Sequence, residues 1–288
     1  MIELRNIEFS YTRNGSPALS GVTAVIQPGI HLLAGENGAG KTTLLHVMAG
    51  LSRPTAGQCL IDGRPADTDN PSEKSRTFIL EENTIFPAKT IREFARFHAN
   101  FYPRFSQETF LSNLKVFGFT GDEPMKSLSL GNRKKTQLAY VLALGVDVLL
   151  LDEPTNALDI QSKEILRRIM ATSIREGQTI IVATHTVSEL EYLFDGALML
   201  TRSRLLFAGT EEAVTRRLAF EVSRVPEDDA IYSEIQVGRV LSILPAIPGD
   251  EPTRVDWRLF YSALHSPKRD AMLKALSRPV EPSNQENL

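Results

Sequence analysis

The feature that most constrains the fold of this 288-residue chain is a glycine-rich run that joins an apolar segment to a helical one. Gly35 is followed, after four residues, by Gly40, Lys41 and Thr42, and the apolar residues 30–34 come directly before it. Such glycines let backbone N–H groups close around phosphate oxygens at a helix N-terminus, where the helix dipole favours an anion. The alternative is a turn that only joins strand to helix. The complete pattern predicts a phosphate-binding P-loop, in which Lys41 reaches the β- and γ-phosphates.

The second feature is a pair of acidic residues, Asp152 and Glu153, which end a predicted buried strand after the apolar residues 148–151. In an open parallel sheet, ligands bind outside the carboxyl ends of the strands. We therefore expect Asp152 to be a partner of Mg²⁺, directly or through water, together with the Thr42 hydroxyl. Glu153 is then placed to orient or deprotonate the water that attacks a γ-phosphate. Acidic residues also commonly end strands, and it is the P-loop upstream that favours the functional interpretation.

Buried strands alternate with helices along most of the chain, which predicts an α/β fold with a parallel sheet. We expect residues 64–76 to form a polar loop. The predicted strands are residues 2–11 with a slip near Asn6, 22–26, 30–34, 54–62, 146–151 and 179–184, with a hairpin at 197–201 and 204–208. The predicted helices are residues 44–51, the Phe-rich 90–118, 132–144, 162–176 and a short one at 187–194.

Composition narrows the function classes. The formal net charge of −3 comes from 32 basic and 35 acidic residues, so there is no broad basic field and we expect no nucleic-acid partner. The single Cys59 excludes an intramolecular disulfide framework and suits a reducing cytosol. A membrane span needs roughly 18 or more apolar residues in a row, and the sequence has no such run.

Further motifs follow the P-loop in a fixed order: Tyr11, Ser129-Leu130-Gly131-Asn132, Leu151-Asp152-Glu153-Pro154-Thr155, Asn156-Ala157-Leu158-Asp159 and His185. With this set, residues 1–215 resemble the ATPase of an ATP-binding cassette (ABC) system. The resemblance implies a P-loop NTPase of ABC type, with a RecA-like parallel sheet core, an N-terminal antiparallel β subdomain and an inserted helical subdomain at about 88–133.

The resemblance also implies ATP and Mg²⁺ as cofactors and assigns roles to residues. Tyr11 stacks on adenine, and His185 contacts the γ-phosphate. Ser129 and Gly131 cap the γ-phosphate bound by the opposite subunit, although Leu130 and Asn132 depart from the common Leu-Ser-Gly-Gly-Gln, and Asp159 matches a loop that contacts the opposite subunit. The implied catalytic residues are Lys41, Glu153 and His185. The implied nucleotide-binding residues are Tyr11, Gly35, Asn37, Gly38, Ala39, Gly40, Lys41, Thr42, Thr43, Ser129 and Gly131.

The clearest departure from the family lies in the Q-loop, where Glu81 stands in place of the usual Gln. Glu81 then joins Thr42 and Asp152 as a metal ligand, and it adds negative charge beside the triphosphate, which raises a carboxyl pKa or slows turnover. The alignment is ambiguous by one residue, so Glu82 is the alternative.

The predicted function is the ATP-binding and ATP-hydrolysing subunit of a bacterial ABC transporter. Residues 97–105 resemble antibiotic- or lantibiotic-type exporters, so we expect an exporter, with most of the Phe rings in the helical subdomain's own core and the rest in a docking patch. The partners would be a separate integral-membrane permease and a second ATPase, identical or similar. The chain would be cytoplasmic, held on the inner face of the membrane by the permease. The alternative is a soluble or regulatory ABC ATPase.

Residues 216–288 lie outside the resemblance and are predicted to form a small α+β appendage. Residues 222–225 and 234–244 are predicted strands, 257–264 a helix, and 279–288 a disordered tail. A regulatory or dimer-stabilising role and a purely structural role both remain open.

Overall fold

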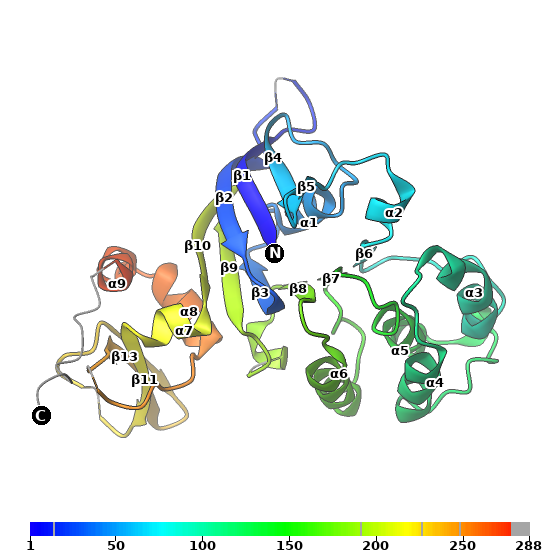
Figure 1. Ribbon diagram of the computed structural model, residues 1–288. Helices are drawn as coiled ribbons and strands as arrows, with labels where there is room; N and C mark the ends of the chain where they lie inside the picture. The colour runs from blue at the N-terminus through cyan, green and yellow to red at the C-terminus, as the bar shows by residue number, and fades with distance from the viewer. Residues whose placement is uncertain (14, 191, 226, 248, 278–288) are drawn as a thin grey trace, which may run out of the picture.

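The computed structural model describes residues 1–13, 15–190, 192–225, 227–247 and 249–277. Its central sheet has the strand order β10-β9-β3-β8-β7-β6 (Figure 1). Strands β6, β7, β8, β3 and β9 run parallel, and β10 pairs antiparallel with β9. The bounds are β3 Gly29–Gly35, β6 Thr77–Leu80, β7 Val148–Asp152, β8 Thr179–Thr184, β9 Gly196–Thr201 and β10 Arg204–Thr210. The predicted α/β fold with a parallel core is confirmed.

An antiparallel sheet of order β2-β1-β4-β5 is formed by the N-terminal part of the chain. Helix α1 packs between this sheet and the central one, because its apolar residues share one buried cluster with Ile2 and Leu4 of β1 and with Leu150 of β7. The slip predicted near Asn6 is confirmed by a register shift in β1 and by a positive φ of 48° at that residue. The bounds are β1 Ile2–Phe9, β2 Leu19–Ile26, α1 Lys41–Met48, β4 Ala56–Ile61 and β5 Arg64–Pro65.

A helical part lies at the edge of the central sheet near β6 (Figure 1). The continuous helix expected at residues 90–118 is wrong: the chain leaves the helix at residues 102–106, which include Pro103. Phe110 is fully buried, whereas Phe97 and Phe101 are 67% and 70% exposed. The elements are α3 Ile91–His98, η1 Ala99–Phe101, α4 Gln107–Val116, η2 Met125–Ser127 and α5 Leu130–Val141, followed after β7 by α6 Ile160–Ser173 and η3 Val187–Leu190.

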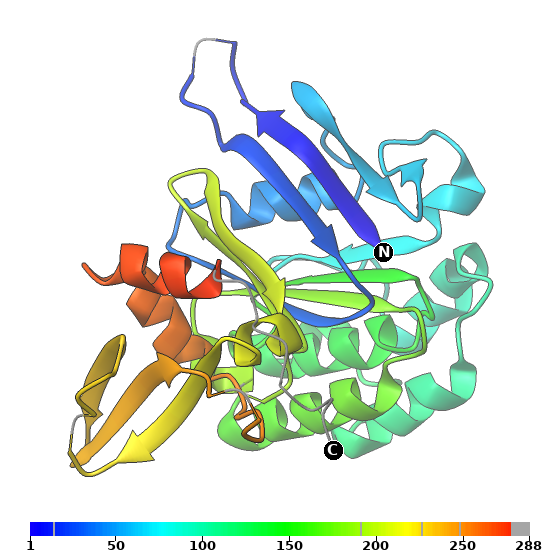
Figure 2. The same cartoon turned by 60° about the vertical axis from the view of Figure 1, so that its left-hand side comes forward.

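The C-terminal part packs against β10 at the opposite edge of the central sheet, as Figures 1 and 2 show, and its helix Trp257–Leu264 also contacts η3. Trp257 and Phe260 are buried against Phe207 of β10. The single strand expected at 234–244 is wrong, because Val237 and Gly238 both have positive φ and turn the chain into a hairpin. The elements are α7 Glu211–Thr215, β11 Leu218–Ser223, β12 Tyr232–Gln236, β13 Arg239–Pro245, α8 Trp257–Leu264 and α9 Arg269–Leu276. The tail predicted at 279–288 lies outside the described residues.

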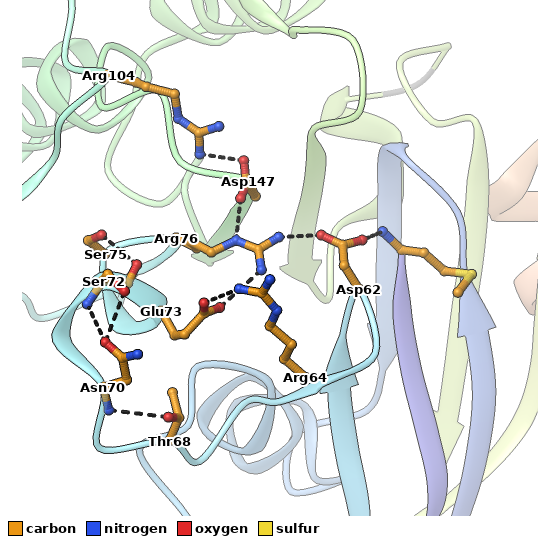
Figure 3. A network of polar contacts seen from close by, with 11 residues as sticks. Asp62, Arg64, Thr68, Asn70, Ser72, Glu73, Ser75, Arg76, Arg104 and Asp147 are labelled. Atoms are coloured by element: carbon orange, nitrogen blue, oxygen red, sulfur yellow. Dashed lines mark hydrogen bonds and ion pairs between the residues drawn. The ribbon is translucent and has the colours of Figure 1, made fainter.

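An ion-pair network joins three parts of the molecule (Figure 3). Arg76 donates to Asp147 at 2.6 Å and to Glu73 at 3.1 Å, and it also pairs with Asp62. Arg104 of the helical part pairs with Asp147 as well. Residues 64–76 are therefore not only a polar loop: they contain β5 and the short helix α2 (Pro71–Lys74), which carries Glu73.

The described residues include no helix with both the length and the apolar character that a membrane crossing requires.

Candidate nucleotide-binding site

A cleft of about 550 Å³ opens where β3, β7 and β8 end and α1 begins. It brings together most of the nucleotide-binding and catalytic residues expected from the sequence. Its lining residues are Tyr11, Ala18, Asn37, Gly38, Gly40, Lys41, Thr42, Thr43, Glu82, Asp152, Glu153, Asn156 and His185. Of these, Ala18 and Asn156 were given no role from the sequence. Ala18 lies in no recognisable motif, whereas Asn156 directly follows the acidic motif.

The P-loop wraps tightly around the start of α1. Gly40 has a φ of 104°, and a Cβ atom on it would lie only 2.5 Å from the carbonyl oxygen of Ala18, so glycine is required there. The Lys41 ammonium donates to the carbonyls of Gly35 at 2.7 Å and of Glu36 at 3.3 Å. Burial lowers the pKa of Lys41 against the opposing pull of the carboxylates. The ammonium is thus held over the loop, where a phosphate would meet it.

Two oxygen ligands suited to Mg²⁺ meet across the cleft. The Thr42 hydroxyl donates to the carboxylate of Asp152 at 2.7 Å, which joins the start of α1 to the end of β7. Asp152 is 7% exposed, and its burial raises the pKa of the carboxyl. A hydroxyl and a buried carboxylate at this spacing fit the hard oxygen ligands that Mg²⁺ takes beside phosphates.

Glu153 has the geometry of a group that acts on water. Its backbone has a φ of 45°, a left-handed conformation that costs free energy for a residue other than glycine. Its Oε1 accepts from the backbone N–H of His185 at 3.1 Å and lies 2.7 Å from the His185 ring Nδ1. Among the described residues, no group hydrogen-bonds its other oxygen, Oε2, although that atom is buried. An unsatisfied buried carboxylate oxygen beside a phosphate site is a ready acceptor for a water proton.

The two Q-loop carboxylates point to different partners. Glu81, the expected metal ligand, lies 2.6 Å from His46 of α1 through its Oε1. Glu82 lines the cleft and accepts from the Asn156 side chain at 2.7 Å. In this structure, therefore, Glu82 and not Glu81 contributes to the cleft wall.

Tyr11 stands at the mouth of the cleft, as an adenine-stacking residue would. Its ring is 68% exposed, and its hydroxyl lies 2.9 Å from the Thr43 hydroxyl. Phe9 supports the ring edge-on, with centroids 5.0 Å apart. An exposed ring fixed at both ends offers a flat face to a base.

The Ser129–Asn132 motif starts α5 and does not line this chain's own cleft. The Ser129 hydroxyl caps the helix by accepting from the N–H of Asn132 at 3.3 Å. A Cβ on Gly131 would lie 2.3 Å from the Ala157 carbonyl oxygen, so only glycine allows this close approach. Asp159 caps α6 and pairs with Lys135 at 2.9 Å. Leu130 is 65% exposed, so the motif faces outward.

Comparison with known proteins identifies the family in which these motifs occur together. The model of the ABC transporter family matches residues 19–156. The chain is 30% identical to a putative ABC transporter ATP-binding protein of Pyrococcus furiosus, over 73% of this chain and 83% of the relative. The chain belongs to the ABC transporter ATP-binding family. This ABC ATPase is also 34% identical to the energy-coupling factor transporter ATP-binding protein EcfA2 of Methanospirillum hungatei, over 74% of its own length, and it spans 56% of that relative.

Two further matches extend the comparison. The sulfate/thiosulfate import ATP-binding protein CysA of Mesorhizobium japonicum is 28% identical over 97% of this chain and 81% of the relative. A solved ATP-binding subunit of an ABC transporter superimposes with a TM-score of 0.66 at 23% identity, covering 75% of this ABC ATPase and 92% of that chain. This likeness confirms the ABC ATPase fold.

Proposed function

We propose that this ABC ATPase hydrolyses ATP between two cassettes and thereby drives a separate membrane permease. The observation that carries the proposal is the pair Glu153 and His185, with one carboxylate oxygen bound by the histidine and the other buried and free of any described partner. A protein that only bound nucleotide would have no need for a strained backbone that aims a carboxylate into the cleft.

The chemistry is an in-line attack of water on the γ-phosphate. Glu153 would orient that water and accept its proton, while Lys41 and His185 would stabilise the charge that develops on the phosphate oxygens. Thr42 and Asp152 would hold Mg²⁺, which neutralises charge on the phosphates. Of the two Q-loop carboxylates, Glu82 lines the cleft, while Glu81, whose charge raises the pKa of Asp152, remains the alternative.

The need for a second cassette follows from the position of the Ser129–Asn132 motif. Its outward-facing helix N-terminus suits a phosphate, but it lies away from the cleft of its own chain. An identical or similar partner would therefore complete each cleft.

An apolar groove supports docking of a permease. Its volume is about 790 Å³, and it lies between the Q-loop and the helical part. Ile85 at its rim is 74% exposed. The lining residues are Ile85, Phe86, Pro87, Ala88, Lys89, Thr90, Glu93, Pro124, Met125, Lys126 and Arg133. Three cations against one carboxylate favour a permease segment with apolar and acidic side chains. Such docking would hold the chain on the cytoplasmic face of the membrane.

The direction of transport is the most specific part of the predicted function. The exporter type rests on the resemblance of residues 97–105, where Phe97 and Phe101 are exposed and the remaining rings pack within the helical part. CysA, by contrast, is an import protein by its name. Export therefore stays a prediction, and transport of radiolabelled substrate into inverted vesicles is the measurement that decides the direction.

The substitution Glu153→Gln tests the proposed function. We expect steady-state ATP hydrolysis to fall by about a hundredfold or more, while ATP binding persists and traps a dimer in size-exclusion chromatography. Normal hydrolysis by E153Q would contradict the assignment.

If the wild-type chain hydrolyses ATP but no multi-span permease co-purifies from detergent extracts, the soluble or regulatory alternative is favoured.

A further inference from the structure

Lys134 is a buried cation on α5 whose position the mechanism does not explain. It is 4% exposed and lies in the second turn of the helix that Ser129 caps. Its ammonium donates to the backbone carbonyls of Glu81 and Glu82, each at 3.4 Å. The carboxylates of Glu82, Asp152 and Glu153 attract this ammonium and favour its charged form, but its burial outweighs them and lowers its pKa. A buried charge that has only long hydrogen bonds is costly, which indicates a role beyond packing.

A second side chain makes the same connection one turn later. Gln137 is 3% exposed, and its amide donates to the carbonyl of Thr84 at 2.7 Å. Segment 81–84 is therefore attached to α5 at three backbone carbonyls. The same segment carries Glu82, which lines the cleft and binds Asn156.

The N-terminal end of α5 is itself held with little freedom. Gly131 approaches the Ala157 carbonyl so closely that no Cβ would fit. Asn156, the residue before Ala157, contacts Glu82. The cleft wall, segment 81–84 and the start of α5 thus form one connected set of contacts.

We propose that Lys134 and Gln137 are positioning residues that couple the occupancy of this chain's own cleft to the placement of the Ser129–Asn132 motif, which serves the opposite cleft. The proposal rests on the proposed function, since it requires hydrolysis between two cassettes. Neither residue touches nucleotide; both act through segment 81–84.

The decisive variants are Lys134→Met, which removes the charge with little change in volume, and Gln137→Leu, which removes the Thr84 hydrogen bond without changing charge. We expect each to bind ATP within about twofold of wild type, because neither side chain lines the cleft. We expect kcat to fall by about tenfold and the Hill coefficient for ATP to fall toward 1, since the two clefts would no longer be coupled. Lys134→Arg keeps both the charge and the donors and should retain cooperativity.

The matched control is Lys115→Met, at an exposed lysine of α4 in the same helical part, which should leave kcat and the Hill coefficient unchanged. Loss of ATP affinity in K134M with an unchanged Hill coefficient would show a direct electrostatic effect on the nucleotide and overturn the proposal. A normal Q137L would overturn it too, even if K134M failed to fold. If the wild-type chain itself hydrolysed no ATP, the proposed function would have failed instead.

Discussion

At the scale of single residues, the cleft holds a charge that is poorly solvated before ligand binds. Asp152 is almost fully buried, and burial raises the pKa of its carboxyl. For an acid with a raised pKa, the ionised form destabilises the fold at any pH above the folded pKa. The Thr42 hydroxyl offsets part of this cost. Binding of a cation would therefore offset a charge that destabilises the ligand-free protein.

The substitution Asp152→Asn should therefore stabilise the nucleotide-free protein while it abolishes Mg²⁺-dependent hydrolysis. We expect Tm to rise by about 2–4 °C at pH 7, which corresponds to about 1 kcal/mol for a chain of this size. The gain should shrink as pH falls through the folded pKa of Asp152, because the wild-type carboxyl then becomes neutral too. Differential scanning calorimetry between pH 4 and 8 measures this. A lower Tm at pH 7 would contradict the account.

The choice between the Q-loop carboxylates is a second residue-scale prediction. Glu82→Ala should reduce kcat by about tenfold, because Glu82 lines the cleft, whereas Glu81→Ala should change it by less than about threefold. Parallel ATPase assays of the two variants at saturating Mg²⁺ decide the matter. The reverse order of effects would restore Glu81 as the metal ligand.

The sequence predicts Lys41, Thr42 and Asp152 correctly as neighbours, because each lies in a local pattern at the end of a strand or the start of a helix. It cannot decide between Glu81 and Glu82. Their orientation depends on His46 of α1 and on Asn156 after β7, and these contacts exist only once the sheet has formed.

At the scale of elements, the helical part shows where the spacing of apolar residues does not predict the bounds of the helices. Its apolar rings suggest one long helix, but Phe94 lies in α3, Phe110 in α4 and Phe105 in the segment between them. All three rings contact Tyr140 of α5. Helix α9 was not predicted either. The turn between β12 and β13 was missed because Val237 has a positive φ, which a β-branched residue rarely adopts. Among the parallel strands, β8 was predicted with its correct bounds, since a run buried on both faces is apolar throughout, whereas β6 was not predicted.

His98 gives this aromatic cluster a pH dependence. Its Nδ1 lies 2.8 Å from the Tyr140 hydroxyl, its ring stacks on Phe94, and burial lowers its pKa. The unfolded chain then binds a proton more readily than the folded one. Stability contributed by neutral His98 is complete above pH 6.5, the unfolded pKa, and is lost as pH falls from there toward the folded pKa.

We expect the Tm of His98→Phe to fall less than that of wild type between pH 7.5 and pH 5, although the variant loses about 1 kcal/mol at neutral pH with the Tyr140 hydrogen bond. Thermal unfolding followed by circular dichroism at both pH values tests this. His31, whose pKa is also lowered by burial, is present in both proteins and cancels in the comparison. Equal pH slopes would show that His98 is not the titrating group.

At the scale of the whole molecule, the parts are joined at two edges of the central sheet. At the β10 edge, Trp257 donates to the Phe194 carbonyl at 3.4 Å and packs on Phe207, which fixes the C-terminal part to the cassette. The sequence predicts helix 257–264 but not the surface that it covers, because docking of one amphipathic element on another leaves no local pattern. At the β6 edge, Phe78 of β6 packs edge-on against Tyr102 of the helical part, and ion pairs add an electrostatic join.

Asp147 is the residue on which this electrostatic join depends. It accepts from Arg76, which precedes β6, and from Arg104 of the helical part (Figure 3). Burial raises the pKa of Asp147, but the hydrogen bonds from the two arginines outweigh it and hold the pKa below its ordinary value. The stability gained is therefore present above about pH 4 and lost as pH falls through the folded pKa.

The substitution Asp147→Asn should lower the free energy of unfolding by about 2 kcal/mol at pH 7, because it weakens two charge-assisted hydrogen bonds and leaves Arg104 without this partner. The corresponding drop in Tm is about 4–8 °C, and limited proteolysis should cut first near residues 102–106. The matched control is Asp122→Asn, at an exposed carboxylate that pairs with Arg92 within the helical part and is expected to change stability by less than about 1 kcal/mol. Equal losses in the two variants would mean that Asp147 stabilises the protein only as an ordinary surface ion pair does, and that the helical part is held to the sheet by its apolar contacts alone.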